Sequence, residues 1–449
     1  MRTRRTTSPF RGKPVRAVVP ATRQSATADT PDMKEAPMRI AHHTWEFPPT
    51  IVGGLGTYSQ CITTALADLG HEVHVWSPDQ VGWPKTVVPV PHPRVHERRL
   101  PLFDITGVFP HLLNDDLRNW GGYLSDLITF NLQATGETRL TEGLDVIAVQ
   151  DWLSAIAGLS LAKDRKVPVV FHIHSAEWGR QPGGGGSASV RNFEASMAHH
   201  ADAVVTVSHA MREDLIAHGW DAGKIHTVWN GVDPKRYRPG IATTAETDAL
   251  RARYGIPNGV PVILYVGRLV PEKGVLPMIE AVPSVLASNP DAHLVVLGAG
   301  QMEGPMRTRI ADLGVGGQVH MRAELVSEHE RIVHFEMCDV GLFPSTYEPF
   351  GIVTLEAMAI GKACVAGARG VVGFREQVVP SGDGQTGLHV DGGNPTDIAW
   401  GLNEALSDRH RLATWGANGR ARVLAEFTWE IAAKKTAEIY RALLSGTSH

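Results

Sequence analysis

The regular alternation of short apolar strands with amphipathic helices, which begins at Met38, constrains the fold of this chain more than any other feature. Residues 38–45, MRIAHHTW, are typical of a buried strand. The tight loop VGGLG follows at 52–56, and residues 57–70 carry apolar side chains at helical spacing, with a glycine at the end. The next strand is residues 71–78. This order predicts a βαβ unit of a parallel, doubly wound α/β sheet.

The same pattern continues along the chain and falls into two consecutive sets of elements, which suits 449 residues. In the first set, four more strands are predicted at residues 144–150, 168–174, 202–208 and 224–231. In the second set, strands are predicted at residues 261–269, 293–300, 318–322, 339–345, 362–367 and 386–390, with helices between them, such as 277–288 and 397–408. We place the joint in the polar stretch of about residues 234–260. The predicted domains, 38–240 and 241–427, face a cleft, with ligands at the carboxyl ends of the strands.

The first 37 residues differ from the rest of the chain. They are rich in Arg, Thr, Ser and Pro, have no acidic residue before Asp29 and show no apolar period, so we expect disorder. The segment is a flexible tail, the result of a start codon assigned ahead of Met38, or an extension like a transit peptide. We favour the first two, and a secretory signal lacks its apolar core here.

Composition narrows the classes of function. The formal net charge is only -4, so no overall basic field attracts nucleic acid or anionic lipid. No apolar run approaches the roughly 18 residues of a membrane span. The three cysteines, Cys61, Cys338 and Cys364, are too far apart to suggest a disulfide framework or a zinc knuckle. A reducing, cytoplasmic location is therefore the expectation.

The motif EPFGIVTLE, Glu348 to Glu356, is the strongest chemical signal. Glu348 follows a predicted strand on a loop that Pro349 and Gly351 shape, and Glu356 lies about one turn inside the next helix. A carboxylate near a helix N-terminus is favoured by the helix dipole and stays ionised. Ionised carboxylates accept hydrogen bonds and suit the hydroxyl pairs of a sugar or ribose. Taken alone, the pair is about as consistent with a loop cap and a helix surface.

The motif VGRLVPEKG, Val266 to Gly274, also follows a predicted strand. Arg268 and Lys273 flank a loop that leads into a helix, and two cations with a helix N-terminus suit a diphosphate. A surface pair of Glu272 and Lys273 beside a solvated Arg268 is the alternative.

The glycine loop Gly53–Gly56 is a further candidate for an anion site. Its glycines let the backbone approach an anion closely, although a plain tight turn is equally consistent with them. The loop lacks the G-x-G-x-x-G fingerprint of dinucleotide sites.

Two histidines and an Asp-Trp pair follow other strands of the first set. His172 and His174 alternate on one predicted strand and so point to the same face, with His174 nearer the ligand end. A strand histidine is more often a satisfied core residue than a catalyst. Asp151 and Trp152 suit contact with a sugar, or serve as an N-cap and a packed ring. The glycine-rich residues 181–189 are expected to form a mobile loop that closes over an acceptor.

Several phosphate and metal motifs are absent from the sequence. It contains no G-x-x-x-x-G-K-[ST] loop, no H-E-x-x-H helix and no Asp-x-Asp. A departing diphosphate would then be neutralised by Arg268, Lys273 and helix dipoles, which predicts chemistry without a metal or other cofactor.

In combination these motifs resemble the retaining glycosyltransferases of the GT-B fold, families 4 and 5, over residues 38–445. The E-x7-E signature EPFGIVTLE carries the resemblance, together with GRLVPEKG, NGVD at 230–233, TGLHV at 386–390 and FTWE at 427–430. The resemblance implies two Rossmann-like domains and a C-terminal helix, residues 428–449, that crosses back onto the first domain.

The resemblance also implies roles for single residues. On the donor side, Arg268 and Lys273 would hold the diphosphate, Glu356 the ribose, Glu348 the sugar hydroxyls, and His174 would lie beside the transferred sugar. The loop around Gly54 and the backbone of Phe350, Gly351 and Ile352 would lie near the phosphates and the sugar, and Asp151 and Trp152 would face the acceptor. The implied reaction retains the anomeric configuration by front-face attack within an ion pair, and the leaving phosphate serves as the base.

The substrates stay open at this level. The segments GGLG, GHEV and DW resemble glycogen and starch synthases, but a lysine of those enzymes is missing before GGLG, and their HDW is QDW here, with Gln150. Elongation of an α-1,4-glucan and transfer of glucose to a small molecule, a lipid or a polysaccharide precursor all remain possible, from a UDP-, ADP- or GDP-sugar. A sugar phosphorylase, a non-hydrolysing epimerase, a glycosidase that uses Glu348 and Glu356, and a non-catalytic sugar-nucleotide-binding protein are the rival functions.

Overall fold

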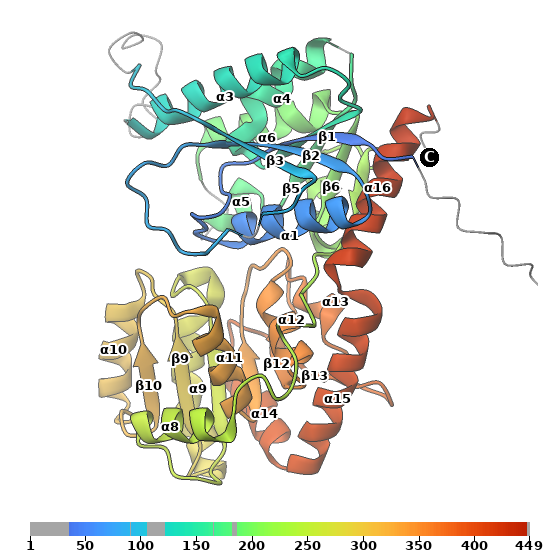
Figure 1. Cartoon of the computed structure of the whole chain (residues 1–449). Helices are drawn as coiled ribbons and strands as arrows, with labels where there is room; N and C mark the ends of the chain where they lie inside the picture. The colour runs from blue at the N-terminus through green and yellow to red at the C-terminus, as the bar shows by residue number, and fades with distance from the viewer. Residues whose placement is uncertain (1–35, 90, 106–121, 165, 182–185, 447–449) are drawn as a thin grey trace, which may run out of the picture. The chain divides into compact units, whose positions relative to one another are not determined.

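The structure is a computed structural model that describes residues 36–89, 91–105, 122–164, 166–181 and 186–446 (Figure 1). The expected disorder of residues 1–37 falls almost wholly outside the described residues. The centre of the glycine-rich loop, residues 182–185, also lies outside them.

The first sheet is parallel throughout, with the strand order β3-β2-β1-β4-β5-β6-β7. Its strands are β1 (Arg39–His43), β2 (Glu72–Pro78), β3 (Val95–Leu100), β4 (Val146–Gln150), β5 (Val169–Ile173), β6 (Ala203–Thr206) and β7 (Ile225–Thr227). All but β3 coincide with predicted strands. The segment VHERRL of β3 has no apolar period because it pairs only with β2 at the edge of the sheet, where most of its side chains stay at least partly exposed.

The second sheet is also parallel, with the order β10-β9-β8-β11-β12-β13. Its strands are β8 (Val262–Val266), β9 (His293–Leu297), β10 (Val319–Arg322), β11 (Val340–Phe343), β12 (Ala363–Gly367) and β13 (Gly387–Val390). Each lies within a predicted strand. The prediction of two Rossmann-like, doubly wound parallel sheets is therefore confirmed, because buried parallel strands give near-continuous apolar runs that a sequence reveals.

Most of the helices lie between these strands in the chain, and the last of them follow β13. Those of the first set are α1 (Gly54–Asp68), α3 (Gly122–Leu140), the 3-10 turn η1 (Trp152–Ser154), α4 (Ala155–Asp164), α5 (Glu177–Arg180), α6 (Ala188–His200) and α7 (His209–Ala217). The second set has α8 (Thr244–Tyr254), η2 (Pro271–Lys273), α9 (Val275–Ser288), α10 (Glu303–Asp312), α11 (Glu328–Met337), α12 (Ile352–Ala359), α13 (Phe374–Gln377), α14 (Pro395–Leu406) and α15 (Arg409–Glu426). No helix in the described parts of the chain combines the length and apolar character that crossing a membrane needs.

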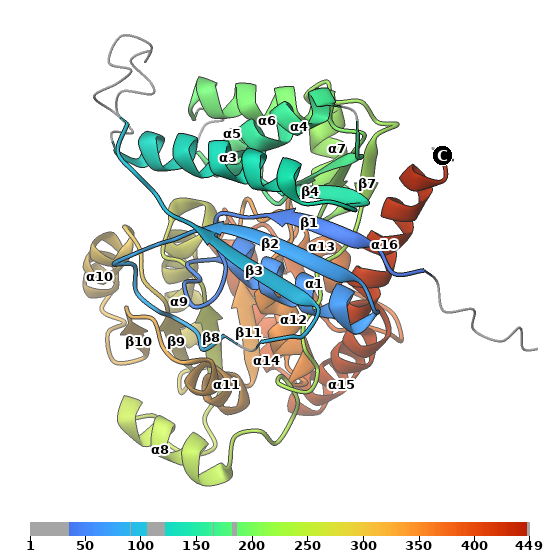
Figure 2. The same cartoon turned by 45° about the horizontal axis from the view of Figure 1, so that its top comes forward.

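The last helix, α16 (Trp429–Leu444), returns to the first set of elements, as the sequence predicts. It packs beside α1, as both views show (Figures 1 and 2). Its buried stripe of Trp429, Ala433, Ala437 and Tyr440 repeats at helical spacing and packs in one cluster with apolar residues of α1. The hydroxyl of Tyr440 also lies 2.8 Å from Nε2 of His172 on β5.

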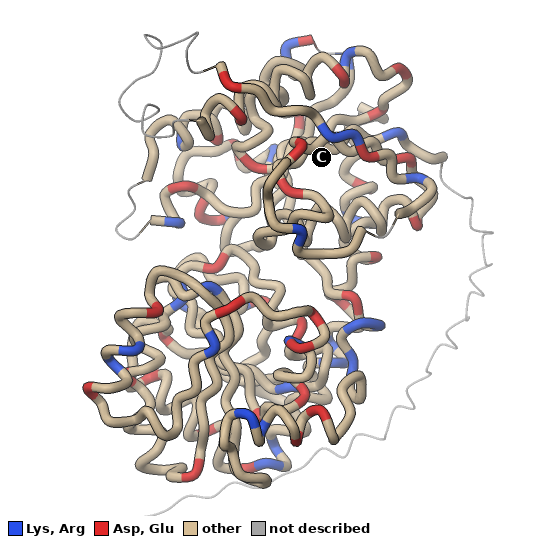
Figure 3. Tube along the Cα trace, turned by 60° about the vertical axis from the view of Figure 1, so that its left-hand side comes forward, with Lys and Arg blue, Asp and Glu red and all other residues tan. Residues whose placement is uncertain are grey.

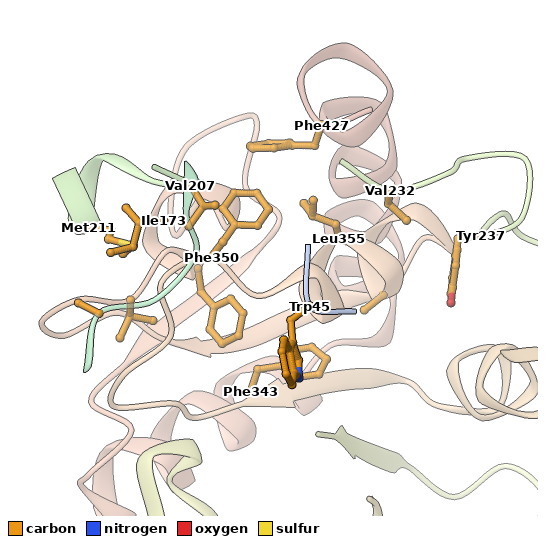
Figure 4. Close-up of a cluster of buried hydrophobic side chains, with 14 of the residues drawn as sticks. Trp45, Ile173, Val207, Met211, Val232, Tyr237, Phe343, Phe350, Leu355 and Phe427 are labelled. Atoms are coloured by element: carbon orange, nitrogen blue, oxygen red, sulfur yellow. The ribbon is translucent and has the colours of Figure 1, made fainter. Parts of the chain in front are cut away.

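A continuous apolar core links the two sheets. One cluster of buried side chains contains Ile173 and Val207 from the first set and Phe350, Leu355 and Phe427 from the second (Figure 4). Acidic and basic residues are interspersed along the chain rather than gathered by sign (Figure 3). The elements that carry the chemical motifs are therefore held against one another by apolar packing.

Candidate active site

The loop between β11 and α12 holds Glu348 at the carboxyl end of the second sheet. Its backbone N–H donates to Val371 at 2.9 Å, and its carbonyl accepts from Gly373 at 2.7 Å. Gly351 then turns the chain into α12 with φ of 81°. A Cβ atom at this position would overlap the ring of Phe374, so the turn requires glycine.

Lys273 and Glu348 meet as an ion pair, although 75 residues separate them in sequence. Both side chains are only 14% exposed. The contact depends on Gly274, whose φ is 66° and whose Cα lies so close to the carbonyl of Pro344 that a side chain would collide with it. The two residues predicted to hold the diphosphate and the sugar therefore share one location.

Arg268 is placed differently from Lys273. Its side chain is 66% exposed, and Nη2 lies 3.4 Å from Glu272. The surface pair of Glu272 and Lys273 that the sequence left as an alternative does not form, because Lys273 pairs with Glu348 and Glu272 pairs with Arg268. The structure does not join Arg268 to the Lys273–Glu348 pair.

Glu356 is buried inside α12, where it meets a second cation. Burial raises the pKa of its carboxyl group, while Arg331 at 3.1 Å and a hydrogen bond from Tyr237 oppose that rise. Burial therefore acts against the ionised state that the sequence led us to expect for this group. Arg331 on α11 supplies the compensating charge, and no motif pointed to it.

The separate partners of the two glutamates bear on the glycosidase alternative. Glu348 is paired with Lys273, whereas Glu356 is paired with Arg331. An acid–base pair in a glycosidase uses two carboxyl groups that face the same bond. The different partners favour two separate binding roles over such a pair.

The backbone of Phe350, Gly351 and Ile352 forms the start of α12. The side-chain amide of Gln377 donates to the carbonyls of Phe350 and Gly351, at 2.8 Å and 3.3 Å. These bonds hold the loop in place at the start of α12. The N–H groups of the first turn of this helix come directly after the loop and have no partner within the helix. Such N–H groups attract anions, which is consistent with the predicted position near the phosphates.

His172 and His174 share a face, as the strand pattern predicts, because the ring of Tyr58 contacts both. His172 is a satisfied core residue, with Tyr58 at 3.2 Å from Nδ1 and Tyr440 at 2.8 Å from Nε2. His174 follows the end of β5, and its Nε2 lies 3.0 Å from Oε1 of Gln150. Burial lowers the pKa of His174, and Asp151 opposes the change.

Asp151 has an unusual backbone, with φ of 52° and ψ of 179°. Its side chain does not cap η1, but accepts the backbone N–H of His174 at 2.8 Å. Conformations of this kind cost on the order of 1–3 kcal/mol in a residue other than glycine. Trp152 is partly buried against the core.

The glycine loop before α1 is occupied in part by a carboxylate that the sequence did not reveal. Oε2 of Glu46 accepts the N–H groups of Val52 and Gly53 at 2.9 and 3.0 Å. A Cβ atom on Gly56 would lie 2.9 Å from the same oxygen, so this glycine makes room for Glu46. An anion at this loop would therefore meet the N–H groups from Gly54 onward.

The comparisons with known proteins agree with this arrangement. Residues 246–422 match the family model of glycosyl transferases group 1, and residues 53–231 match that of a glycosyl transferase 4-like domain. The chain is 30% identical to a glycogen synthase of Mycobacterium tuberculosis, over 91% of this chain and 96% of that protein. The chain belongs to the group 1 glycosyltransferases.

Two further proteins resemble this glycosyltransferase. An alpha-maltose-1-phosphate synthase of Mycolicibacterium smegmatis is 30% identical over 90% of this chain and 99% of that protein. The structure of a sucrose-phosphate synthase from Thermosynechococcus elongatus matches with a TM-score of 0.73 at 24% identity, over 91% of this chain and all of that chain. This likeness, with the two parallel sheets, shows the GT-B fold.

The motif loop of this glycosyltransferase also contacts the segment that follows His174. The hydroxyl of Tyr347, next to Glu348, lies 3.1 Å from the backbone nitrogen of Ala176. The ring of Tyr347 packs so closely on Gly179 that no side chain fits there. Tyr347 directly precedes the recognised motif, and Gln150 was noted only as a departure from the HDW pattern. By contrast, Glu46 and Arg331 carry no sequence signal of their own.

Proposed function

We propose that this enzyme moves a hexose, most simply glucose, from a nucleotide-diphosphate sugar to a hydroxyl acceptor, with retention of configuration and without a metal. The buried ion pair of Lys273 and Glu348 is the observation that best supports the proposal. It places an ammonium group and a carboxylate at the end of β11. The ammonium group suits a phosphate, and the carboxylate suits the hydroxyl groups of a sugar.

In this proposal, the two charges separate when the donor binds. Lys273 turns to the diphosphate, and Glu348 accepts hydrogen bonds from the hydroxyl groups of the sugar. Arg268 is 66% exposed on the same loop as Lys273 and adds a second positive charge beside the diphosphate. Glu356 holds the ribose and keeps Arg331 as its counter-ion.

The reaction then breaks the bond between C1 of the sugar and the diphosphate oxygen. Lys273, Arg268 and the first turn of α12 stabilise the negative charge that develops on the leaving group. The acceptor hydroxyl attacks from the same side, and its proton passes to the departing phosphate oxygen. Among the described residues, no group of three or more His, Cys, Asp or Glu is arranged to hold a metal ion. Independence of metal remains a prediction.

Two acceptor classes are supported by different relatives. The similarity to a glycogen synthase favours elongation of an α-1,4-glucan. The similarity to an alpha-maltose-1-phosphate synthase, at the same identity, favours a small phosphorylated sugar. The sequence departs from the starch-synthase pattern at Gln150 and before the glycine loop. We therefore give equal weight to a small phosphorylated sugar and to an α-1,4-glucan as the acceptor.

Thermal unfolding with a panel of UDP-, ADP- and GDP-sugars tests the donor. A ligand at 100 times its dissociation constant adds roughly 2.7 kcal/mol to the stability of the folded state. The absence of a shift with every member of the panel would defeat the proposal. Turnover of the best donor is then followed with glycogen, with glucose 1-phosphate and with EDTA present, and the anomeric proton of the product reports retention.

The same assay separates the rival functions. A sugar phosphorylase would release a sugar phosphate when inorganic phosphate is supplied and would need no nucleotide. A non-catalytic binding protein would show the thermal shift without turnover.

A further inference from the structure

Two consecutive residues, Gln150 and Asp151, both contact His174. Oε1 of Gln150 lies 3.0 Å from the ring nitrogen Nε2, and Oδ1 of Asp151 accepts the backbone N–H at 2.8 Å. Successive side chains of an extended strand point to opposite faces of a sheet. An ordinary continuation of β4 would therefore not direct both side chains at one neighbour.

The backbone of Asp151 makes this double contact possible. Asp151 is the sole non-glycine residue with positive φ in the described part of the chain. Its N–H still donates to the carbonyl of His172 at 2.8 Å, so the turn happens directly at the end of the β4–β5 pairing. Strain of this kind persists only where the surroundings fix it, and it gathers at functional sites.

The amide of Gln150 also determines which ring nitrogen of His174 carries the proton. In this orientation its oxygen faces Nε2 of His174, so that nitrogen carries the proton. The amide nitrogen faces Nδ1 of His42 at 3.5 Å, and Nε2 of His42 lies 3.2 Å from the hydroxyl of Ser59. Gln150, His42 and Ser59 are all buried, so the chain of contacts is shielded from water.

We propose that Gln150 and Asp151 form a two-point clamp that fixes His174 as its Nε2–H tautomer and leaves Nδ1 to accept a hydrogen bond from a hydroxyl of the donor sugar. Both are positioning residues, and the inference rests on the donor site proposed above. The clamp acts on the sugar alone and does not touch the nucleotide. Its effect can therefore be measured apart from nucleotide binding, by comparing a sugar nucleotide with the nucleoside diphosphate.

Affinity measurements distinguish the clamp from a general structural role. Gln150→Leu removes the acceptor at similar volume, and Gln150→Glu keeps an oxygen in its place. Thr138→Val is the matched control, because the Thr138 hydroxyl likewise bonds a buried histidine, Nε2 of His43 at 2.8 Å, away from His174. Dissociation constants are measured for UDP-glucose and UDP, and for ADP-glucose and ADP.

We expect Gln150→Leu to weaken the binding of the sugar nucleotide about tenfold, which corresponds to the loss of one hydrogen bond. The affinity for the nucleoside diphosphate should stay unchanged. Gln150→Glu should restore most of the loss, and Thr138→Val should change neither constant. Equal affinity of Gln150→Leu and the wild type for the sugar nucleotide would overturn the clamp. Failure of the wild type to bind any of these nucleotides would instead overturn the proposed donor site.

A second measurement needs no substrate and no folded Gln150→Leu protein. The nitrogen NMR signals of the imidazole rings report the tautomer of each histidine, and loss of one set in His174→Asn assigns that residue. We expect His174 of the wild type to carry its proton on Nε2. A proton on Nδ1 would refute the inference even where the affinities agree with it.

Discussion

At the scale of single residues, the site depends on paired charges that are largely removed from water. Lys273, Glu348 and Glu356 are at most 14% exposed, so each of these charges is costly to leave without a partner. Arg331, by contrast, is 34% exposed. A diphosphate sugar offers both a replacement anion and hydroxyl donors. In the proposed function, the donor replaces both partners of the Lys273–Glu348 pair. Glu356, in contrast, keeps Arg331 as its counter-ion.

Removing the charge of Glu348 tests its role in transfer. We expect Glu348→Gln to lower kcat by about 10²–10³, in the range found for a lost transition-state hydrogen bond, while UDP or ADP still binds. The control is Glu303→Gln, since Glu303 forms an exposed pair with Arg307 at 3.0 Å. Unchanged transfer in Glu348→Gln would refute the assigned role.

The buried carboxyl group of Glu194 predicts that the stability of the folded protein depends on pH. Burial raises the pKa of Glu194 to about 7 from 4.5, although Arg180 opposes the change. The folded state therefore binds the proton more tightly than the unfolded state. Stability from this group is complete below about pH 4.5 and is lost as the pH rises to 7, by roughly 3 kcal/mol.

The variant Glu194→Gln removes this titration. Its free energy of unfolding should fall less than that of the wild type between pH 4.5 and 7, as followed by urea unfolding at several pH values. Parallel curves for the two proteins would contradict the raised pKa. Glu303→Gln again serves as the exposed control.

At the scale of elements, glycines set how closely loops approach the ends of the strands. Gly351 must combine a positive φ with contact against Phe374. By contrast, Gly361, just after α12, has a φ of 88° at a position where a Cβ atom would make only ordinary contacts, the nearest at 3.7 Å from Pro239. A substitution would strain the backbone at both positions, but only at Gly351 would the new side chain overlap a neighbour. Comparing the two variants therefore distinguishes the cost of backbone strain from the cost of steric overlap.

We expect Gly361→Ala to cost about 1–2 kcal/mol of stability from its positive φ alone. Gly351→Ala should cost a further 1–3 kcal/mol or so from overlap with Phe374, and it should also weaken donor binding, because the loop carries Glu348. Urea unfolding and nucleotide affinity measure the two effects. Equal stability of the two variants would show that the loop adapts without cost.

At the scale of the whole molecule, residues of the second set complete structures in the first. The carboxylate of Glu376 on α13 accepts the N–H groups of His209 and Ala210 at the start of α7, at 3.0 and 2.7 Å. It also accepts the indole N–H of Trp229 at 2.7 Å. An acidic group at a helix N-terminus is favoured by the helix dipole.

Replacing Glu376 by alanine leaves these three donors without their acceptor. We expect the free energy of unfolding to fall by about 1–3 kcal/mol, with a partial recovery in Glu376→Gln, which keeps one oxygen. The control is Glu438→Ala on the exposed face of α16, which should change stability by no more than about 0.5 kcal/mol. A similar loss in both variants would argue against the contact.

The sequence by itself determined the two parallel sheets and, through its motifs, the glycosyltransferase family, and the resemblance to that family implied the return of the last helix. Periodicity and motif spacing are local properties, and buried parallel strands express them strongly. The edge strand β3 was missed for the same reason, since pairing on one side lets it remain polar. The motif at Glu348 and Glu356 was found, but not what each glutamate contacts.

Only the tertiary structure decided the partners of the site residues. Lys273 reaches Glu348 because the segments that follow the neighbouring strands β8 and β11 approach each other. Arg331 on α11 reaches Glu356 on α12 from a neighbouring helix. The clamp on His174 needed a positive φ at Asp151, which the presence of an aspartate in the sequence does not predict. Such pairings depend on how elements distant in the chain pack together, and a local pattern of residues carries no record of that packing.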